Sequence, residues 1–140
     1  MIDPGGTKRT VFLLLDNPLV RDGLTRLIEM QPDLAVCGER EDSAEALPEI
    51  ASLRPDMVII DSMFLHESAV NLVSDLTRVA PAMKVVVLSV YDDEEDARQA
   101  MRAGAHGYVN RAIQIIVAIR QVLEGGLFPS EDFAEALLAG

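Results

Sequence analysis

Four polar side chains follow short apolar runs of the 140-residue chain. Asp16 follows VFLLL, Asp61 follows MVII, Ser89 follows VVVL, and Arg111 stands just past GYVN. Ligands of open α/β sheets bind beyond the carboxyl ends of the strands. If these runs are neighbouring parallel strands, two carboxylates, a hydroxyl and a guanidinium face one crevice. That combination suits the binding of a charged ligand.

The apolar runs themselves predict the strands. Those at 11–15, 57–60 and 85–88 are apolar throughout, which is typical of parallel strands that helices cover on both faces. Two shorter, mixed runs at 34–38 and 107–109 have the composition of edge strands. The sequence therefore predicts five strands.

Apolar residues at helical spacing predict a helix after each strand. The first begins at Pro18 with Asn17 as its cap, and Ser43 can cap the second, which Pro48 should delay or kink. The others are expected at 69–79, 97–101 and 113–123, the last ending at Gly125 and Gly126, and Ser130 can cap a further helix with Phe133, Leu137 and Leu138. This alternation predicts an α/β fold, a doubly wound, five-stranded parallel sheet with helices on both faces.

Charge and composition argue against several classes of protein. A formal net charge of −11 repels polyphosphate and disfavours direct binding of nucleic acid. The single Cys37 excludes an internal disulfide and fits a cytoplasmic location. No run approaches the roughly 18 apolar residues of a membrane span. The sequence also contains no GxxxxGK loop, so nucleotide hydrolysis has no support.

Longer motifs resemble those of one family. NPLVRDGLTRLIE, RPDMVIID, VVVLSVYDDEEDARQAMRAGAHGYV and the later GG resemble the receiver domain of bacterial response regulators, in particular the branch that carries a helix-turn-helix output domain. The resemblance covers roughly residues 9–126 and implies the flavodoxin-like strand order 2-1-3-4-5. We expect residues 1–8 to be a flexible leader and 127–140 to begin a linker or extra helix towards an output domain that these residues lack.

The resemblance also implies a role for each site residue. Asp61 is the phosphate acceptor, and Mg²⁺ is bound by Asp16, Asp61 and the backbone carbonyl of Met63. Ser89 hydrogen-bonds the phosphoryl oxygens, and Tyr108 is the aromatic side chain that switches rotamer. The implied partners are a sensor histidine kinase, a second copy in a homodimer, and DNA only through the output domain. On this interpretation the chain is a phosphoacceptor signalling domain and not an enzyme.

Two positions depart from the family's pattern. Leu15 stands where the family has the first of two adjacent acids, which should weaken Mg²⁺ binding. Arg111 replaces a lysine, and its planar guanidinium can fork onto Asp61 or Asp16 in an ion pair. The segment SMFLHE after Asp61 also lacks the family's usual Met-Pro-Gly run.

Each residue taken singly has an ordinary structural explanation. Asp16 fits a helix cap, Ser89 a turn, and Tyr108 the packing of an edge strand. The histidines His66 and His106 lack metal-ligand spacing, and the acids at 92–96 fit the solvated first turn of a helix.

The sequence leaves two functions open. In the first, Asp61 accepts a phosphoryl group with weakened Mg²⁺ binding. In the second, the domain is a degenerate receiver that acts as a phosphorylation-independent dimerisation or protein-interaction module. A flavin-binding electron carrier of similar topology is disfavoured, because the chain has no Trp, only two Tyr and four Phe, and no phosphate-cradling loop after the first predicted strand.

Overall fold

A single parallel sheet forms the centre of the computed structural model, which describes residues 8–65, 72–89 and 94–139. Its strands lie in the order β2-β1-β3-β4-β5, which confirms the predicted fold class. The strands are β1 (Arg9–Leu14), β2 (Leu34–Arg40), β3 (Met57–Asp61), β4 (Lys84–Leu88) and β5 (Gly107–Val109).

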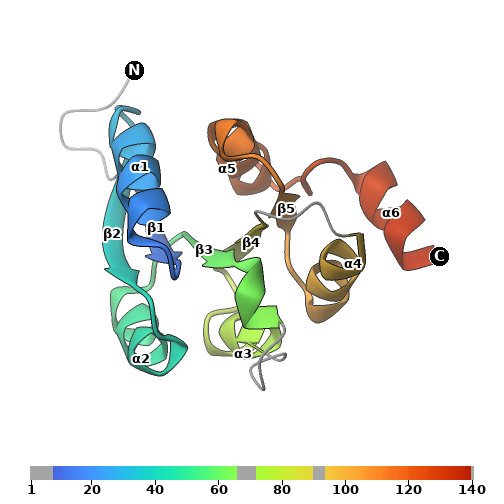
Figure 1. Ribbon diagram of the computed structural model, residues 1–140, viewed down its shortest axis with the longest axis horizontal. Coiled ribbons are helices and arrows are strands. Elements are labelled where there is room, and N and C mark those ends of the chain that lie inside the picture. The colour runs from blue at the N-terminus through green and yellow to red at the C-terminus, as the bar shows by residue number, and fades with distance from the viewer. Residues whose placement is uncertain (1–7, 66–71, 90–93, 140) are drawn as a thin grey trace.

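Helices cover both faces of this sheet. They are α1 (Pro18–Glu29), α2 (Ser43–Leu53), α3 (Leu72–Val79), α4 (Glu94–Ala103), α5 (Ile115–Leu123) and α6 (Glu131–Ala139), with short 3₁₀ helices η1 (Ser62–Leu65) and η2 (Ala112–Gln114). Helices α1 and α5 lie on one face, and α2, α3 and α4 lie on the other (Figure 1). The predicted start of the third helix at 69 falls outside the described residues. Within the described part of the chain, no helix combines the length and hydropathy that a membrane span needs.

Side-chain caps fix where the first two helices begin. The Asn17 side chain accepts the backbone N–H of Leu19 at 2.8 Å, which confirms the predicted cap of α1. The second prediction was wrong, because Asp42 and not Ser43 caps α2, accepting the N–H of Ala44 at 2.7 Å. The helix then continues through Pro48 without a late start. A proline removes only its own bond to the carbonyl four residues back, and the buried side chains of α2 hold the rest of the helix.

The alternation of side chains along β1 divides the core into two layers. Phe12 and Leu14 face the layer under α2, α3 and α4, whereas Val11, Leu13 and Leu15 face the layer under α1 and α5. All five are almost completely buried. Because successive strand residues point to opposite faces, a strand between two layers must be apolar throughout, as the sequence predicted.

Helix α4 differs from the prediction at its first turn. Glu94 and Glu95 are exposed, in agreement with the expected solvated start, but Asp96 is 2% exposed. The predicted solvated acidic turn is therefore wrong at Asp96.

The segment after α5 folds back along the free edge of β5. The backbone N–H of Tyr108 donates to the Phe128 carbonyl at 3.1 Å, and the N–H of Phe128 donates to the His106 carbonyl at 3.0 Å. His106 also accepts the Val85 N–H on its Nδ1 at 3.1 Å. Burial lowers the pKa of His106, and the charge of Lys84 acts in the same direction.

Helix α6 follows this edge segment and packs against α4, as Figure 1 shows. Its start is fixed by Ser130, whose hydroxyl oxygen accepts the N–H of Phe133 at 3.0 Å. The predicted cap is confirmed.

An ion pair joins α5 to the start of β2. Arg120 donates to both carboxylate oxygens of Asp33, at 2.8 and 2.9 Å, and to the side chain of Gln31 at 3.0 Å. The hydrogen bond from Arg120 holds the pKa of Asp33 at about 2. This fork links two segments that are 87 residues apart in sequence.

Candidate functional site

The register of the sheet sets the predicted site residues at one edge. Asp61 is the last residue of β3 and pairs with Leu88, so Ser89 lies one residue beyond that level. Leu14 pairs with Ile60, which places Leu15 level with Asp61 and Asp16 just past it.

Asp61 lies half-buried at this edge. Its Oδ1 accepts the backbone N–H of Met63, in η1, at 3.2 Å. Burial raises the pKa of the Asp61 carboxyl, and the nearby charge of Asp16 raises it further, whereas backbone N–H groups of Met63 and Asp16 act in the opposite direction. The charge and the backbone N–H of Asp16 therefore both act on the Asp61 carboxyl.

The two residues after β1 have opposite environments. Asp16 is exposed, and Leu15 is 1% exposed and packs in the layer under α1 and α5. The Leu15 backbone is also fixed, since its N–H donates to the Arg40 carbonyl at 3.0 Å. The side chain that stands in place of an acid thus packs in the core, while its backbone lies level with Asp61.

Ser89 and Tyr108 are both buried beside the end of β4. Ser89 is 1% exposed, and its backbone N–H donates to the Val109 carbonyl at 2.8 Å. Tyr108 is 6% exposed and belongs to the layer that also contains Met101 of α4 and Ala134 of α6. The Tyr108 side chain is therefore enclosed by packing on the α4 side of the sheet.

Arg111 lies two residues past β5 at the start of η2. Its side chain is exposed, and its carbonyl accepts the N–H of Gln114 at 2.9 Å. The ion pair that Arg111 could form with Asp61 or Asp16 is not present between these described residues. Arg111 is in extended backbone conformation (φ −141°) directly before η2.

A cation would find two carboxylates here. Among the residues that the structure describes, no three His, Cys, Asp or Glu side chains gather to hold a metal ion. Mg²⁺ commonly binds one or two carboxylates and keeps several of its waters. Asp16 and Asp61 therefore fit a weakly held, largely hydrated Mg²⁺ and not a complete protein cage.

Sequence reasoning missed Arg21 of α1. Its guanidinium donates to the Leu15 carbonyl at 2.8 Å and lies 3.7 Å from Glu39 and 3.5 Å from Glu41. This half-buried cation holds the backbone directly before Asp16. The sequence places Arg21 on the first turn of a predicted helix, but that position does not predict its hydrogen bond to the Leu15 carbonyl.

Comparison with known proteins gives a consistent family assignment. Residues 11–122 match the family model described as "Response regulator receiver domain". The "Transcriptional regulatory protein DegU" of Brevibacillus brevis is 29% identical over 124 residues, which are 86% of this chain and 52% of that protein. The "DNA-binding transcriptional activator DevR/DosR" of Mycobacterium tuberculosis is 33% identical over 132 residues, 92% of this chain and 61% of that protein. The chain thus spans between half and two thirds of the length of these relatives.

Solved structures show the same fold. A LuxR-family two-component response regulator from Aurantimonas superposes with a TM-score of 0.80 at 26% identity, covering 95% of this chain and 97% of that one. The signal receiver domain of the putative response regulator NarL from Mycobacterium tuberculosis gives a TM-score of 0.74 at 25% identity, covering 85% and 98%.

Proposed function

The chain belongs to the response regulator receiver family, a family of signalling domains, and on that premise we propose that Asp61 accepts a phosphoryl group from the phosphohistidine of a sensor kinase. The observation that supports this best is the parallel register, which sets Asp61 level with the end of β4 and beside Asp16. Ser89 is the first residue after β4.

The transfer exchanges one phosphorus bond for another. A carboxylate oxygen of Asp61 bonds to phosphorus, the phosphorus–nitrogen bond of the phosphohistidine breaks, and the imidazole leaves. Mg²⁺ bound by Asp16, Asp61 and the backbone carbonyl of Met63 would neutralise charge on the transferring oxygens. The Ser89 hydroxyl would donate a hydrogen bond to a phosphoryl oxygen.

Arg111 supplies the cation of this proposal. Its guanidinium makes no ion pair in the described structure, so binding a phosphoryl group breaks no existing pair. A guanidinium can donate two parallel hydrogen bonds to phosphate oxygens. In this proposal the exposed Arg111 side chain changes rotamer, and its guanidinium then contacts the phosphoryl group on Asp61.

Phosphorylation then shifts a population between two conformations. The Ser89 N–H already holds the Val109 carbonyl, directly after Tyr108 in β5. A phosphoryl group that draws Ser89 towards Asp61 would strain this connection and alter the packing of Tyr108 against α4. A partner protein would then recognise the altered surface of α4 and β5.

Labelling of the native chain tests this function. The chain is incubated with Mg²⁺ and a small phosphodonor, and its intact mass is measured beside that of a competent control receiver. We expect the mass of one phosphoryl group on the native chain and none on Asp61→Asn. Labelling that survives Asp61→Asn contradicts the assigned acceptor.

A degenerate receiver is the second candidate, and the burial of Leu15 favours it. In that case the domain acts through protein contacts without phosphorylation. No added mass on the native chain, while the control receiver is labelled, would support this alternative.

We propose a homodimer as the assembly. Leu19 of α1 is 81% exposed, and Ile113 of η2 and Val117 of α5 are 84% and 60% exposed. These apolar side chains lie on α1, on α5 and on the 3₁₀ turn that precedes α5, and an isologous pairing of two copies would bury them. Sedimentation should show a dimer that Val117→Glu weakens, and an unchanged dimer would place the interface elsewhere.

The remaining assignments extend the resemblance to the whole protein. We propose a cytoplasmic protein in which residues 9–126 receive the signal, residues 127–140 lead towards an output domain, and DNA is bound only by that output domain. Transcription would then be controlled through it.

A further inference from the structure

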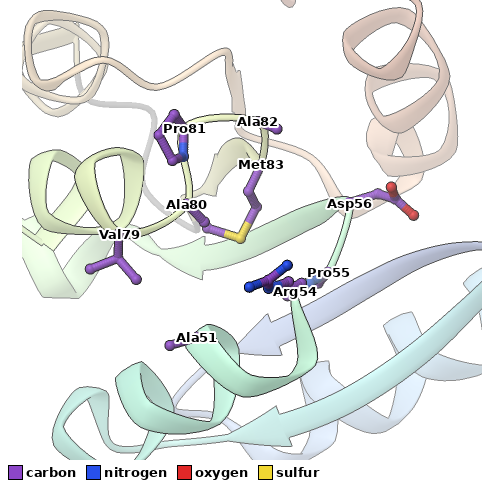
Figure 2. A pocket seen from close by; sticks show the side chains of 9 residues that line it. All are labelled: Ala51, Arg54, Pro55, Asp56, Val79, Ala80, Pro81, Ala82 and Met83. Carbon is purple, nitrogen blue, oxygen red and sulfur yellow. The ribbon is translucent and has the colours of Figure 1, made fainter.

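A pocket of about 450 Å³ opens at the end of the sheet opposite Asp61, between the C-terminal ends of α2 and α3. Its walls are mostly small or apolar. Ala51 lines it from α2, Val79 from α3, and Pro81 and Met83 from the connection to β4 (Figure 2). No residue of the proposed phosphorylation site contributes to it.

Arg54 is the cation of this pocket. It ends α2 in the left-handed region with a φ of 51°, and its N–H caps the helix by donating to the Ile50 carbonyl at 2.9 Å. A side chain other than glycine is strained in this region, so helix termination alone would favour glycine. The guanidinium of Arg54 forms no hydrogen bond or ion pair with any residue that the structure describes.

The nearby acid is already engaged. Asp56 accepts the backbone N–H of Thr10 at 2.7 Å and lies 3.5 Å from the guanidinium of Arg9. Its carboxylate points away from Arg54 and Met83 in Figure 2. The positive charge of Arg54 therefore remains available to a ligand.

We propose that this pocket binds a small monocarboxylate with an apolar body. A carboxylate accepts two parallel hydrogen bonds from a guanidinium, and the body lies between Ala51 and Met83. The Met83 sulfur adds a favourable contact with an aromatic ring. The last carbonyls of α2 and α3 carry partial negative charge, so one negative charge on the ligand is favoured over two.

The probe is 2-naphthoate, titrated into the full ¹⁵N-labelled chain at pH 7 and followed by amide chemical shifts. We expect a dissociation constant of roughly 0.1–1 mM and shifts centred on Ala51, Arg54 and Met83. The neutral 2-naphthalenemethanol should bind at least about fivefold more weakly, since it cannot pair with the guanidinium.

Two substitutions separate the charge from the cavity. Arg54→Gly removes the guanidinium and suits the positive φ, so it should keep the fold and weaken 2-naphthoate about tenfold or more. Ala51→Leu keeps Arg54 and fills the pocket, and should also abolish binding. Arg26→Gln, on α1 at the opposite face, is the matched control and should bind as the native chain does.

Three results would overturn the proposal. They are the absence of shifts up to about 5 mM 2-naphthoate, shifts centred away from the pocket, and equal affinity for the neutral alcohol. Asp61→Asn should bind 2-naphthoate normally, so the outcome does not depend on phosphorylation.

Discussion

Leu15→Asp restores the missing acid at the proposed metal site, and its first effect should be a loss of stability. Leu15 is 1% exposed and packs with Leu24 and Ile28 of α1. Truncating a buried leucine costs about 2–5 kcal/mol, and a new carboxylate next to Asp61 adds desolvation and repulsion. Against a typical domain stability of about 5–15 kcal/mol, we expect a folded variant that melts about 10 °C lower in EDTA.

Magnesium should then restore part of this loss. A ligand that binds only the folded state stabilises it by RT ln(1 + [L]/Kd). If the third carboxylate lowers the dissociation constant from about 10 mM to about 1 mM, ~10 mM Mg²⁺ contributes about 1.4 kcal/mol to the variant and about 0.4 kcal/mol to the native chain. The corresponding shifts in melting temperature are about 4 °C and about 1 °C.

Circular dichroism melts in Mg²⁺ and in EDTA measure both quantities. Leu15→Asn is the matched control, because it loses the same packing and adds no charge. It should show the small Mg²⁺ response of the native chain. A Leu15→Asp response no larger than that of Leu15→Asn would refute the placement of position 15 beside the metal site.

Three further predictions concern stability. His106 has a folded pKa below its ordinary value of 6.5, so the free energy of unfolding should fall as pH drops below about 6.5. His106→Asn keeps an acceptor and should reduce this pH dependence, measured by urea unfolding at several pH values. The pKa of Asp33 is about 2 against an ordinary 3.8, so the contribution of its ionised carboxylate to folding stability should be complete above about pH 4 and lost towards pH 2. Arg120→Lys removes the paired hydrogen bonds to Asp33 and should reduce this loss of stability in acid. In Gly38→Ala the new methyl would lie 2.6 Å from the ring of buried Phe12, which should cost about 1–3 kcal/mol in urea unfolding; a loss below about 0.5 kcal/mol would contradict that contact.

The sequence predicted those features that depend on neighbouring residues. The fully apolar runs gave the strands, because strands between two helix layers have no polar face. Asn17 and Ser130 were recognised as caps since a cap acts on the next two or three residues. Asp42 was missed because it competes with Ser43 at the adjacent position, and both residue types can cap a helix.

Features that depend on distant segments could not be predicted. The exposure of Arg111 and the burial of Asp96 depend on how η2 and α4 lie against the sheet. The pocket at Arg54 needs the ends of α2 and α3 to converge, and no local pattern records that convergence. The roles of Asp16, Asp61 and Ser89 remain predictions, although the register sets them at one edge.

On the proposed function, the departures at Leu15 and Arg111 would act on the same quantity, the negative charge that must be neutralised during phosphoryl transfer. A third carboxylate would raise that charge, and Leu15 instead contributes apolar packing to the core. The raised pKa of Asp61 is accordingly caused first by burial and only then by Asp16. The guanidinium of Arg111 can donate two parallel hydrogen bonds, whereas the lysine ammonium usual in the family acts as a point charge. A site with less negative charge and a stronger phosphate donor needs less help from a metal, so weak Mg²⁺ binding and phosphoryl acceptance on Asp61 are compatible in this chain.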